Sequence, residues 1–331
     1  MCFLRPGLIL ILRGEKRPRE NQRSGEHMSS ATLQNLSSDL AAAADSVGPS
    51  VVAVHAQHRI PSSGIQWRKD VIVTANHGIR RSEDISVLLG PGKSAPATLA
   101  GRDPSTDLAV LKLAGDAKLP LPEVVDASGV KLANLVLALG RSWRGNLVAS
   151  FGIVGGLSGE WQTWHGGKID QHIRLDLEVY SGLSGGPLVN AQGKVVGINT
   201  RGVARGRAVT IPAATVNRVV DELLEKGHIS RPYLGLAMQP VAIPESMRSK
   251  FKSESSGGLV VVHVEPSGPA DQAGILLGDV LVELQGKSLE SLESIQQILS
   301  SAKVGDKIPA TILRGGSPKE LAVTLLDRPT R

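Results

Sequence analysis

The chain has 331 residues, of which 41% are hydrophobic, 21% are charged and only 3% are aromatic. This composition excludes a wholly disordered chain, a collagen and a coiled coil, and the length predicts about two domains. Half of the net charge of +6 lies in residues 1–28, so the nearly balanced remainder and the scarcity of rings for base stacking argue against a nucleic-acid partner.

Residues 1–37 are predicted to be a disordered leader, because polar and charged residues dominate the stretch. Its apolar run Leu8–Leu12 is too short for a membrane-spanning helix, which needs about 20 residues. The run is also shorter than the roughly 7–15 apolar residues of a signal-peptide core, and no small-residue cleavage site follows it. Two interpretations stay open, a degenerate export signal and a translation start at Met28.

A short Ala-rich helix is expected from about Ser38, and Gly48-Pro49 end it. Short β-rich runs then follow one another, bounded by Gly, Pro, Asn and Asp, with no helical pattern between them. This arrangement is typical of a sandwich or barrel and excludes a doubly wound α/β sheet. The expected strands include 51–55, 70–75, 85–89, 108–113, 135–139, 173–177 and 194–199.

A strong amphipathic helix closes the strand-rich region. Thr215 is expected to cap its start and Gly227 to end it. Its apolar stripe has the i, i+3, i+4, i+7, i+8 spacing: Val216, Val219, Val220, Leu223 and Leu224. A second strand-rich region begins near Pro232 and holds a helix with this apolar face: Leu292, Ile295, Ile298 and Leu299. The predicted domains are therefore 38–228 and 232–328.

Ser184 is the candidate nucleophile. It lies in the Gly-rich segment 181–189, Ser-Gly-Leu-Ser-Gly-Gly-Pro-Leu-Val, just before an apolar strand. A nucleophile that attacks a carbonyl needs backbone N–H donors for the oxyanion, and only a turn with little side-chain bulk lets them point at the substrate. Gly182 and Ser184 would supply these donors. A purely structural hairpin turn is the alternative for the same residues.

His77 is the candidate base, because it ends the β-branched run 73–77, where its ring can face a site rather than the core. A merely exposed side chain is the alternative for one of eight histidines. Asp107 is the candidate acid that orients the imidazole. It begins an apolar strand, where burying a carboxylate costs several kcal/mol unless it is paired. Asp103, before Pro104, is interpreted as a turn residue.

The chain order His, Asp, Ser favours one arrangement among the convergent catalytic triads. It is the order of the chymotrypsin-type double barrel, which is also an all-β fold, so the chemistry and the strand pattern agree independently. The sequence has no Walker-type phosphate loop. Its histidine pairs lack a Cys or carboxylate cluster of ligand spacing, so we expect no metal site.

Several blocks resemble the HtrA/Deg family of trypsin-like proteases with a PDZ domain. The protease blocks are 72–77 (Ile-Val-Thr-Ala-Asn-His), 106–112 (Thr-Asp-Leu-Ala-Val-Leu-Lys), 184–190 (Ser-Gly-Gly-Pro-Leu-Val-Asn) and 197–200 (Gly-Ile-Asn-Thr). The PDZ blocks are 233–236 (Tyr-Leu-Gly-Leu), 273–275, 278–281 and the helix near 292–299. The resemblance implies a mainly β chain: a chymotrypsin-like double six-stranded β-barrel, followed by a PDZ domain formed of a small β-barrel with two helices.

Three positions depart from the family pattern, and the first, Gly78 after His77 where Val is usual, has no physical explanation in the sequence. Leu183 stands before the serine where Asn is usual, and it cannot receive a new N-terminus as the Asp of digestive proteases does, so activation by N-terminal cleavage is not expected. Glu178 falls where the lineage places the base of the S1 pocket, a position at which family members generally have a small apolar residue. Glu178 is therefore a candidate S1 residue that would favour a basic P1 side chain, or else a solvent-exposed glutamate.

The resemblance implies a serine endopeptidase that cleaves unfolded or misfolded proteins, with His77, Asp107 and Ser184 as its triad and no cofactor. It also implies a homotrimer in the periplasm or cell envelope. The PDZ region would bind C-terminal peptides by adding a strand to a sheet edge and holding the carboxylate with loop N–H groups. The residues expected there are Tyr233, Leu234, Gly235, Leu236 and Ile295. The rival interpretation is a proteolytically inactive, protease-like scaffold that binds peptides.

Overall fold

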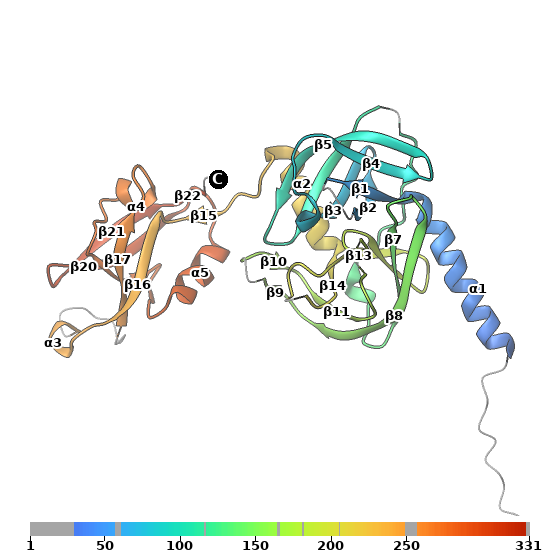
Figure 1. Cartoon of the computed structure of the whole chain (residues 1–331). Coiled ribbons are helices and arrows are strands. Elements are labelled where there is room, and N and C mark those ends of the chain that lie inside the picture. The colour runs from blue at the N-terminus through green and yellow to red at the C-terminus, as the bar shows by residue number, and fades with distance from the viewer. Residues whose placement is uncertain are drawn as a thin grey trace, which may run out of the picture. The chain divides into compact units, whose positions relative to one another are not determined.

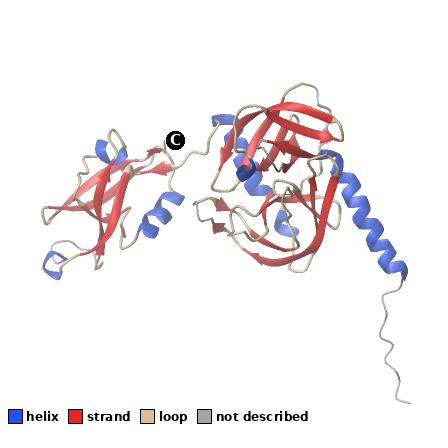
Figure 2. Ribbon diagram, in the orientation of Figure 1, coloured by secondary structure: helices blue, strands red, loops and turns tan. Residues whose placement is uncertain are grey.

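The computed structural model of the chain describes residues 30–56, 61–115, 117–163, 166–180, 182–204, 206–248 and 257–328. Strands dominate the described residues, and helices are few (Figure 2). None of the helices within these ranges is long and apolar enough to cross a membrane. Most of the predicted leader, residues 1–29, lies outside the described ranges.

The first helix, α1 (Ser30–Val47), begins at Ser30 rather than at about Ser38. Residues 30–37 are therefore helical, which corrects the expectation of a disordered leader for this stretch. The reason lies in the spacing of Leu33, Leu36 and Leu40, which extends the apolar stripe of the Ala-rich segment toward the N-terminus. The 3₁₀ turn η1 (Gly48–Ser50), with Pro49 in it, follows the helix as predicted.

A closed six-stranded barrel comes first, and it contains the strands expected near 51–55, 70–75, 85–89 and 108–113. Neighbouring strands are antiparallel and follow the order β1-β2-β3-β6-β5-β4 around the barrel; Figure 1 labels β1 to β5 of this barrel. They are β1 (Val51–His55), β2 (Ser62–Arg68), β3 (Val71–Ala75), β4 (Ile85–Gly90), β5 (Lys93–Asp103) and β6 (Leu108–Leu113).

A second closed barrel has the strand order β11-β14-β13-β12-β7-β8. Its strands are β7 (Leu135–Arg141), β8 (Leu147–Ser158), β11 (His172–Asp176), β12 (Pro187–Asn190), β13 (Val195–Thr200) and β14 (Val209–Pro212). The short pair β9 (Trp161–Gln162) and β10 (Lys168–Ile169) lies between β8 and β11 in the chain, and the 3₁₀ turn η3 (Ala127–Gly129) precedes β7.

Both faces of several barrel strands are buried, which explains why their sequences are continuously apolar instead of alternating. In β6, Ala109 and Leu111 belong to the cluster inside the first barrel. Leu108 and Val110, on the opposite face, belong to a cluster that also contains side chains of the second barrel and of the following helix. The two barrels therefore share one apolar cluster where they meet.

The helix α2 (Ala213–Lys226) buries the predicted stripe, with Val216, Val219 and Val220 in the shared cluster. Gly227 ends it in the left-handed conformation with φ +77°, as expected. The start differs from the prediction: Pro212 is the N-cap residue, and Thr215 lies inside the first turn. The Thr215 hydroxyl instead donates to Asp170 over 2.5 Å, so its polar group serves a tertiary contact rather than a cap.

Residues 232–327 form the second region, a six-stranded sheet with the path β16-β17-β18-β20-β21 and β19 paired to β18. Its strands are β16 (Leu236–Ala242), β17 (Gly257–Val264), β18 (Val280–Leu284), β19 (Lys287–Ser288), β20 (Lys307–Arg314) and β21 (Ser317–Thr324). A two-stranded ladder pairs the ends of the region, β15 (Pro232–Tyr233) and β22 (Leu326–Asp327). Its helices are α3 (Glu245–Arg248), α4 (Pro269–Gln272) and α5 (Leu292–Ser301).

The helix α5 confirms the expected position and most of the expected apolar face. Ile295 and Ile298 are buried in the core of this region, and Leu299 packs against it. Leu292 is the exception, because 41% of it is exposed. It occupies the first position of the helix, directly after the N-cap residue Ser291.

Candidate active site

The loop that carries Ser184 packs against the end of β3. A Cβ on Gly185 would lie 2.2 Å from the Ser63 carbonyl oxygen and 2.6 Å from Ala75 N, so only glycine fits there. Its φ of +89° also favours glycine. Gly185 thus brings the serine loop to the strand that leads into His77, although serine and histidine are 107 positions apart in the numbering.

His77 lies in the 3₁₀ turn η2 (Asn76–Gly78), which follows β3 directly. Its imidazole Nδ1 is 2.7 Å from Asp107 Oδ2, and its backbone N–H donates to Asp107 Oδ1 over 2.8 Å. The neighbouring Asn76 N–H donates to the Asp107 carbonyl oxygen over 2.9 Å. The structure therefore brings the predicted base and the predicted acid together through both side-chain and main-chain contacts.

Asp107 is nearly inaccessible, with 3% of its surface exposed, and its φ is +58°. Besides the two His77 contacts, its Oδ2 accepts a short hydrogen bond from the Thr200 hydroxyl. Gly202 leaves room for this carboxylate, since a Cβ there would lie 2.3 Å from Oδ2. The buried charge is thus compensated by three donors, as a carboxylate at the start of an apolar strand requires.

The pKa of His77 is raised above its ordinary value of 6.5. The hydrogen bond to Asp107 is the main cause, because it stabilises the charged imidazolium; partial burial and the positive charges of Arg201 and Arg80 act in the opposite direction. The other face of the ring is open to solvent, with 45% of the side chain exposed. Such a histidine can take up and release a proton near neutral pH.

Around Ser184 the backbone has few free donors. In residues 182–186, as far as they are described, the N–H groups of Leu183, Gly185 and Gly186 donate to carbonyl oxygens. Gly182 and Ser184, whose N–H groups are the predicted oxyanion donors, lie in the same turn, and this role stays a prediction. Gly182 has a φ of +98°, and its carbonyl oxygen accepts from the Ser63 hydroxyl over 2.6 Å, which fixes the orientation of this peptide.

Leu183, the residue that departs from the family pattern, is buried in the core of the second barrel with 1% exposure. It packs on Gly140, where a Cβ would lie 2.6 Å from Leu183 Cδ2. Leu183, in place of the usual Asn, therefore packs in the apolar interior of the second barrel. Glu178, two residues after β11, is exposed, and its role at an S1 pocket stays a prediction.

Thr200 is a residue beside the site that the sequence analysis did not single out, whereas Arg201 belongs to a basic run for which the sequence favours solvated loop charge over a loop near the cleft. The block 197–200 contains Thr200, but a threonine at a strand end carries no sign of its distant acceptor, Asp107. Arg201, like Arg80, is a positive charge that opposes protonation of His77 and so lowers its pKa. No group of three or more His, Cys, Asp or Glu residues with metal-binding geometry occurs within the described ranges.

The residues predicted to bind peptides lie at one edge of the second region's sheet. Among the described residues β16 pairs with β17 alone, which leaves its other side as an open edge, and α5 lies beside it. Leu234 and Ile295 are buried members of the core, with 4% and 5% exposure, whereas Tyr233 and Leu236 are half-buried. Gly235 has a φ of +71°, which turns the chain sharply between β15 and β16.

Comparison with known proteins agrees with this architecture. Residues 62–198 match the trypsin-like peptidase domain family and residues 232–325 match the PDZ domain family. The serine protease Do-like HtrB of Bacillus subtilis is 35% identical over 283 residues, which are 80% of this chain and 61% of that protein. The serine protease Do-like HtrA of Lactobacillus helveticus is 37% identical over 272 residues, which are 78% of this chain and 65% of that protein.

Solved structures agree as well. The serine endoprotease from Yersinia pestis has a TM-score of 0.66 at 28% identity and covers 87% of this chain and 97% of its own. The HtrA-type protease AlgW with a decapeptide has a TM-score of 0.65 at 26% identity and covers 88% and 99%. The chain spans about three fifths of the two curated relatives described above. The chain therefore combines a trypsin-like peptidase domain with one PDZ domain, and its homologues are named as HtrA-type serine proteases.

Proposed function

We propose that this chain is a serine endopeptidase in which His77 is the general base, Asp107 orients it and Ser184 is the nucleophile. The observation that carries the proposal is the 2.7 Å contact between His77 Nδ1 and the buried Asp107 carboxylate, beside the loop that holds Ser184. Because Nδ1–H donates to Asp107, Nε2 is left as the acceptor, which is the tautomer that a base needs.

In the proposed reaction, His77 Nε2 takes the proton from the Ser184 hydroxyl while the serine oxygen attacks the substrate carbonyl. The Gly182 and Ser184 N–H groups bind the oxyanion that forms. His77 then gives its proton to the leaving amine, and an acyl-enzyme remains, which water hydrolyses by the same base catalysis. Asp107 keeps its charge throughout and stabilises the imidazolium.

We further propose that residues 38–228 act as the protease domain and residues 232–328 as a PDZ domain that captures C-terminal peptides of unfolded proteins. The open edge of β16 supports this, because an extended peptide can add a strand there. The decapeptide in the AlgW structure named above is a further support. Leu234 and Ile295 would form the floor of the pocket, and Leu236 its rim.

Replacing Ser184 with Ala tests the proteolytic activity. We expect Ser184→Ala to abolish both casein cleavage and labelling by a fluorophosphonate probe, with an unchanged unfolding temperature. Ser86→Ala, on β4 in the first barrel, is the matched control and should retain both. Cleavage that persists in Ser184→Ala would refute the assignment. A wild-type chain that neither cleaves nor is labelled, with or without a C-terminal peptide, would favour the inactive scaffold.

A further inference from the structure

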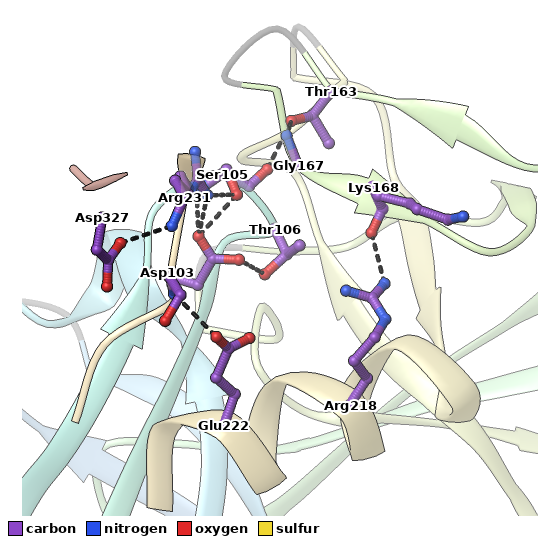
Figure 3. Close-up of polar contacts among 11 residues, drawn as sticks. Asp103, Ser105, Thr106, Thr163, Gly167, Lys168, Arg218, Glu222, Arg231 and Asp327 are labelled. Carbon is purple, nitrogen blue, oxygen red and sulfur yellow. Dashed lines mark hydrogen bonds and ion pairs between the residues drawn. The ribbon is translucent and has the colours of Figure 1, made fainter. Parts of the chain in front are cut away.

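Arg231 lies between α2 and β15, and its side chain reaches the turn that precedes Asp107 (Figure 3). Its Nη2 donates to Asp103 Oδ1 over 2.6 Å and makes a short contact with the Ser105 hydroxyl. Only 3% of the Asp103 side chain is exposed, against 30% of the Arg231 side chain. The guanidinium of Arg231 therefore contacts a carboxylate that is almost completely buried.

Asp103 organises the turn from within. Its Oδ1 accepts from the Ser105 N–H over 3.0 Å and from the Ser105 hydroxyl over 2.7 Å, and its Oδ2 accepts from the Thr106 hydroxyl over 2.7 Å. All of these donors are neutral, so Arg231 is the charged partner among the contacts of this buried carboxylate. The turn residue predicted from the sequence is thus also half of an ion pair.

The turn ends at Asp107, whose left-handed backbone is unusual for a residue with a side chain. Such a conformation persists only where the surrounding structure holds it. On the C-terminal side, Leu108 is paired with Ala75 in the first barrel. On the N-terminal side, the Asp103 turn is the support, and the Thr163 hydroxyl donates to the Ser105 carbonyl oxygen over 2.6 Å to hold it from outside. The turn therefore directs the Asp107 carboxylate toward His77.

The backbone around Arg231 is fixed as well, so its side chain does not extend from a loose segment. The Arg231 N–H donates to Asp327 Oδ1 over 2.7 Å, and its carbonyl oxygen accepts from the Arg328 N–H over 2.9 Å. The preceding Ser230 N–H donates to Glu222 on α2 over 2.9 Å. These contacts present the guanidinium to Asp103 at a set distance.

We propose that Arg231 is a positioning residue for the proteolytic reaction: by holding the Asp103 turn, it keeps the Asp107 carboxylate aligned with His77. The inference rests on the proposed function of His77, Asp107 and Ser184. It assigns a kinetic role to a residue outside the matched protease segment 62–198 and one position before the PDZ match at 232.

The test compares Arg231→Met with Arg314→Met in the full chain. Arg314 forms a nearly identical ion pair with Asp279 in the second region, at 2.7 Å and with 31% and 2% of the two side chains exposed. Both substitutions remove one charged partner from a buried aspartate, but only Arg231 adjoins the Asp107 turn. The measurements are kcat and KM on a fluorogenic peptide from pH 5 to 9, the rate of fluorophosphonate labelling, and the unfolding temperature.

We expect Arg231→Met to lower kcat by about tenfold to a hundredfold with little change in KM, because misalignment of a reacting group has effects of this size. The acidic limb of the kcat/KM profile should move to lower pH, because a weaker bond to Asp107 no longer raises the pKa of His77. If the substitution acted only by removing the positive charge of Arg231, the pKa of His77 would rise and the acidic limb would move to higher pH. Arg314→Met should keep the wild-type kcat and pH profile.

If Arg231→Met matches Arg314→Met in kcat and in the acidic limb, the inference is wrong and the proposed function stands. If Arg231→Met does not fold, Arg231→Gln, which removes the charge and keeps an N–H donor, is measured in its place, and wild-type kinetics of that variant overturn the inference. A wild-type chain that is neither labelled nor able to cleave refutes the function itself, and the role of Arg231 falls with it.

Discussion

Replacing Asp107 with Asn probes the proposed mechanism most directly, because the structure dictates how the new amide must lie. Oδ1 accepts the His77 backbone N–H, which can only donate, so the amide oxygen must occupy that position. The NH₂ group then takes the place of Oδ2 and points at His77 Nδ1, where the Thr200 hydroxyl can turn to accept from it. The imidazole is forced to carry its proton on Nε2 and cannot act as a base.

We therefore expect Asp107→Asn to lower kcat by about 10⁴-fold near neutral pH, the size of effect that a wrong tautomer causes in a triad. KM should change little, because no substrate contact is lost. The assay is hydrolysis of a fluorogenic peptide together with the rate of fluorophosphonate labelling. Asp279→Asn, which neutralises a similarly buried aspartate of the second region, is the control for folding. A folded Asp107→Asn chain with activity within about tenfold of wild type would refute the tautomer argument.

Four further predictions concern pH dependence, packing and peptide binding. Because the pKa of His77 is raised and only the neutral ring is a base, activity should rise as pH increases through a midpoint above 6.5; a flat rate from pH 5 to 8 would contradict this. Arg201→Gln should move that midpoint to still higher pH, since it removes a charge that lowers the pKa, and an unmoved midpoint would contradict the electrostatic account. Gly185→Ala should lower the unfolding temperature far more than Gly115→Ala, which has a similar φ and nothing within 4 Å, as calorimetry would check; equal losses would contradict the packing argument. Leu236→Asp should weaken binding of a C-terminal peptide, measured by fluorescence anisotropy against its amidated form, and undiminished affinity would rule out this edge of the sheet.

The sequence predicted most where the signal is local. The apolar runs at 51–55 and 108–113 became β1 and β6 with those bounds, because hydrophobic burial on both faces dominates such segments. The segment 62–68 escaped notice, since Ser62 and Ser63 do not look like strand residues. Its burial depends on the distant Gly182 carbonyl and Arg141 N–H, both of which bond to the Ser63 hydroxyl.

Ion pairs between residues far apart in the chain were the hardest feature to predict from the sequence. His77, Asp107 and Ser184 could be chosen as candidates because each lies in a local pattern of its own and their order in the chain matches one arrangement of catalytic triads. Arg231 carries no such sign, because an arginine before a proline at a domain boundary looks like a solvated linker residue. Its partner Asp103 lies 128 positions away, and only the folded chain places the two together.

The open edge of β16 limits what can be added to it. Pro240, in the second half of this strand, has no N–H to offer, so a ladder built along the edge loses a rung there and a guest chain finds its donors mainly in the stretch before it. The missing N–H of Pro240 also disfavours edge-to-edge pairing of β16 with another copy of the chain, which is a route to aggregation. If a peptide adds to this edge as proposed, we expect a short segment that pairs with the residues before Pro240 to fit better than a long flat strand.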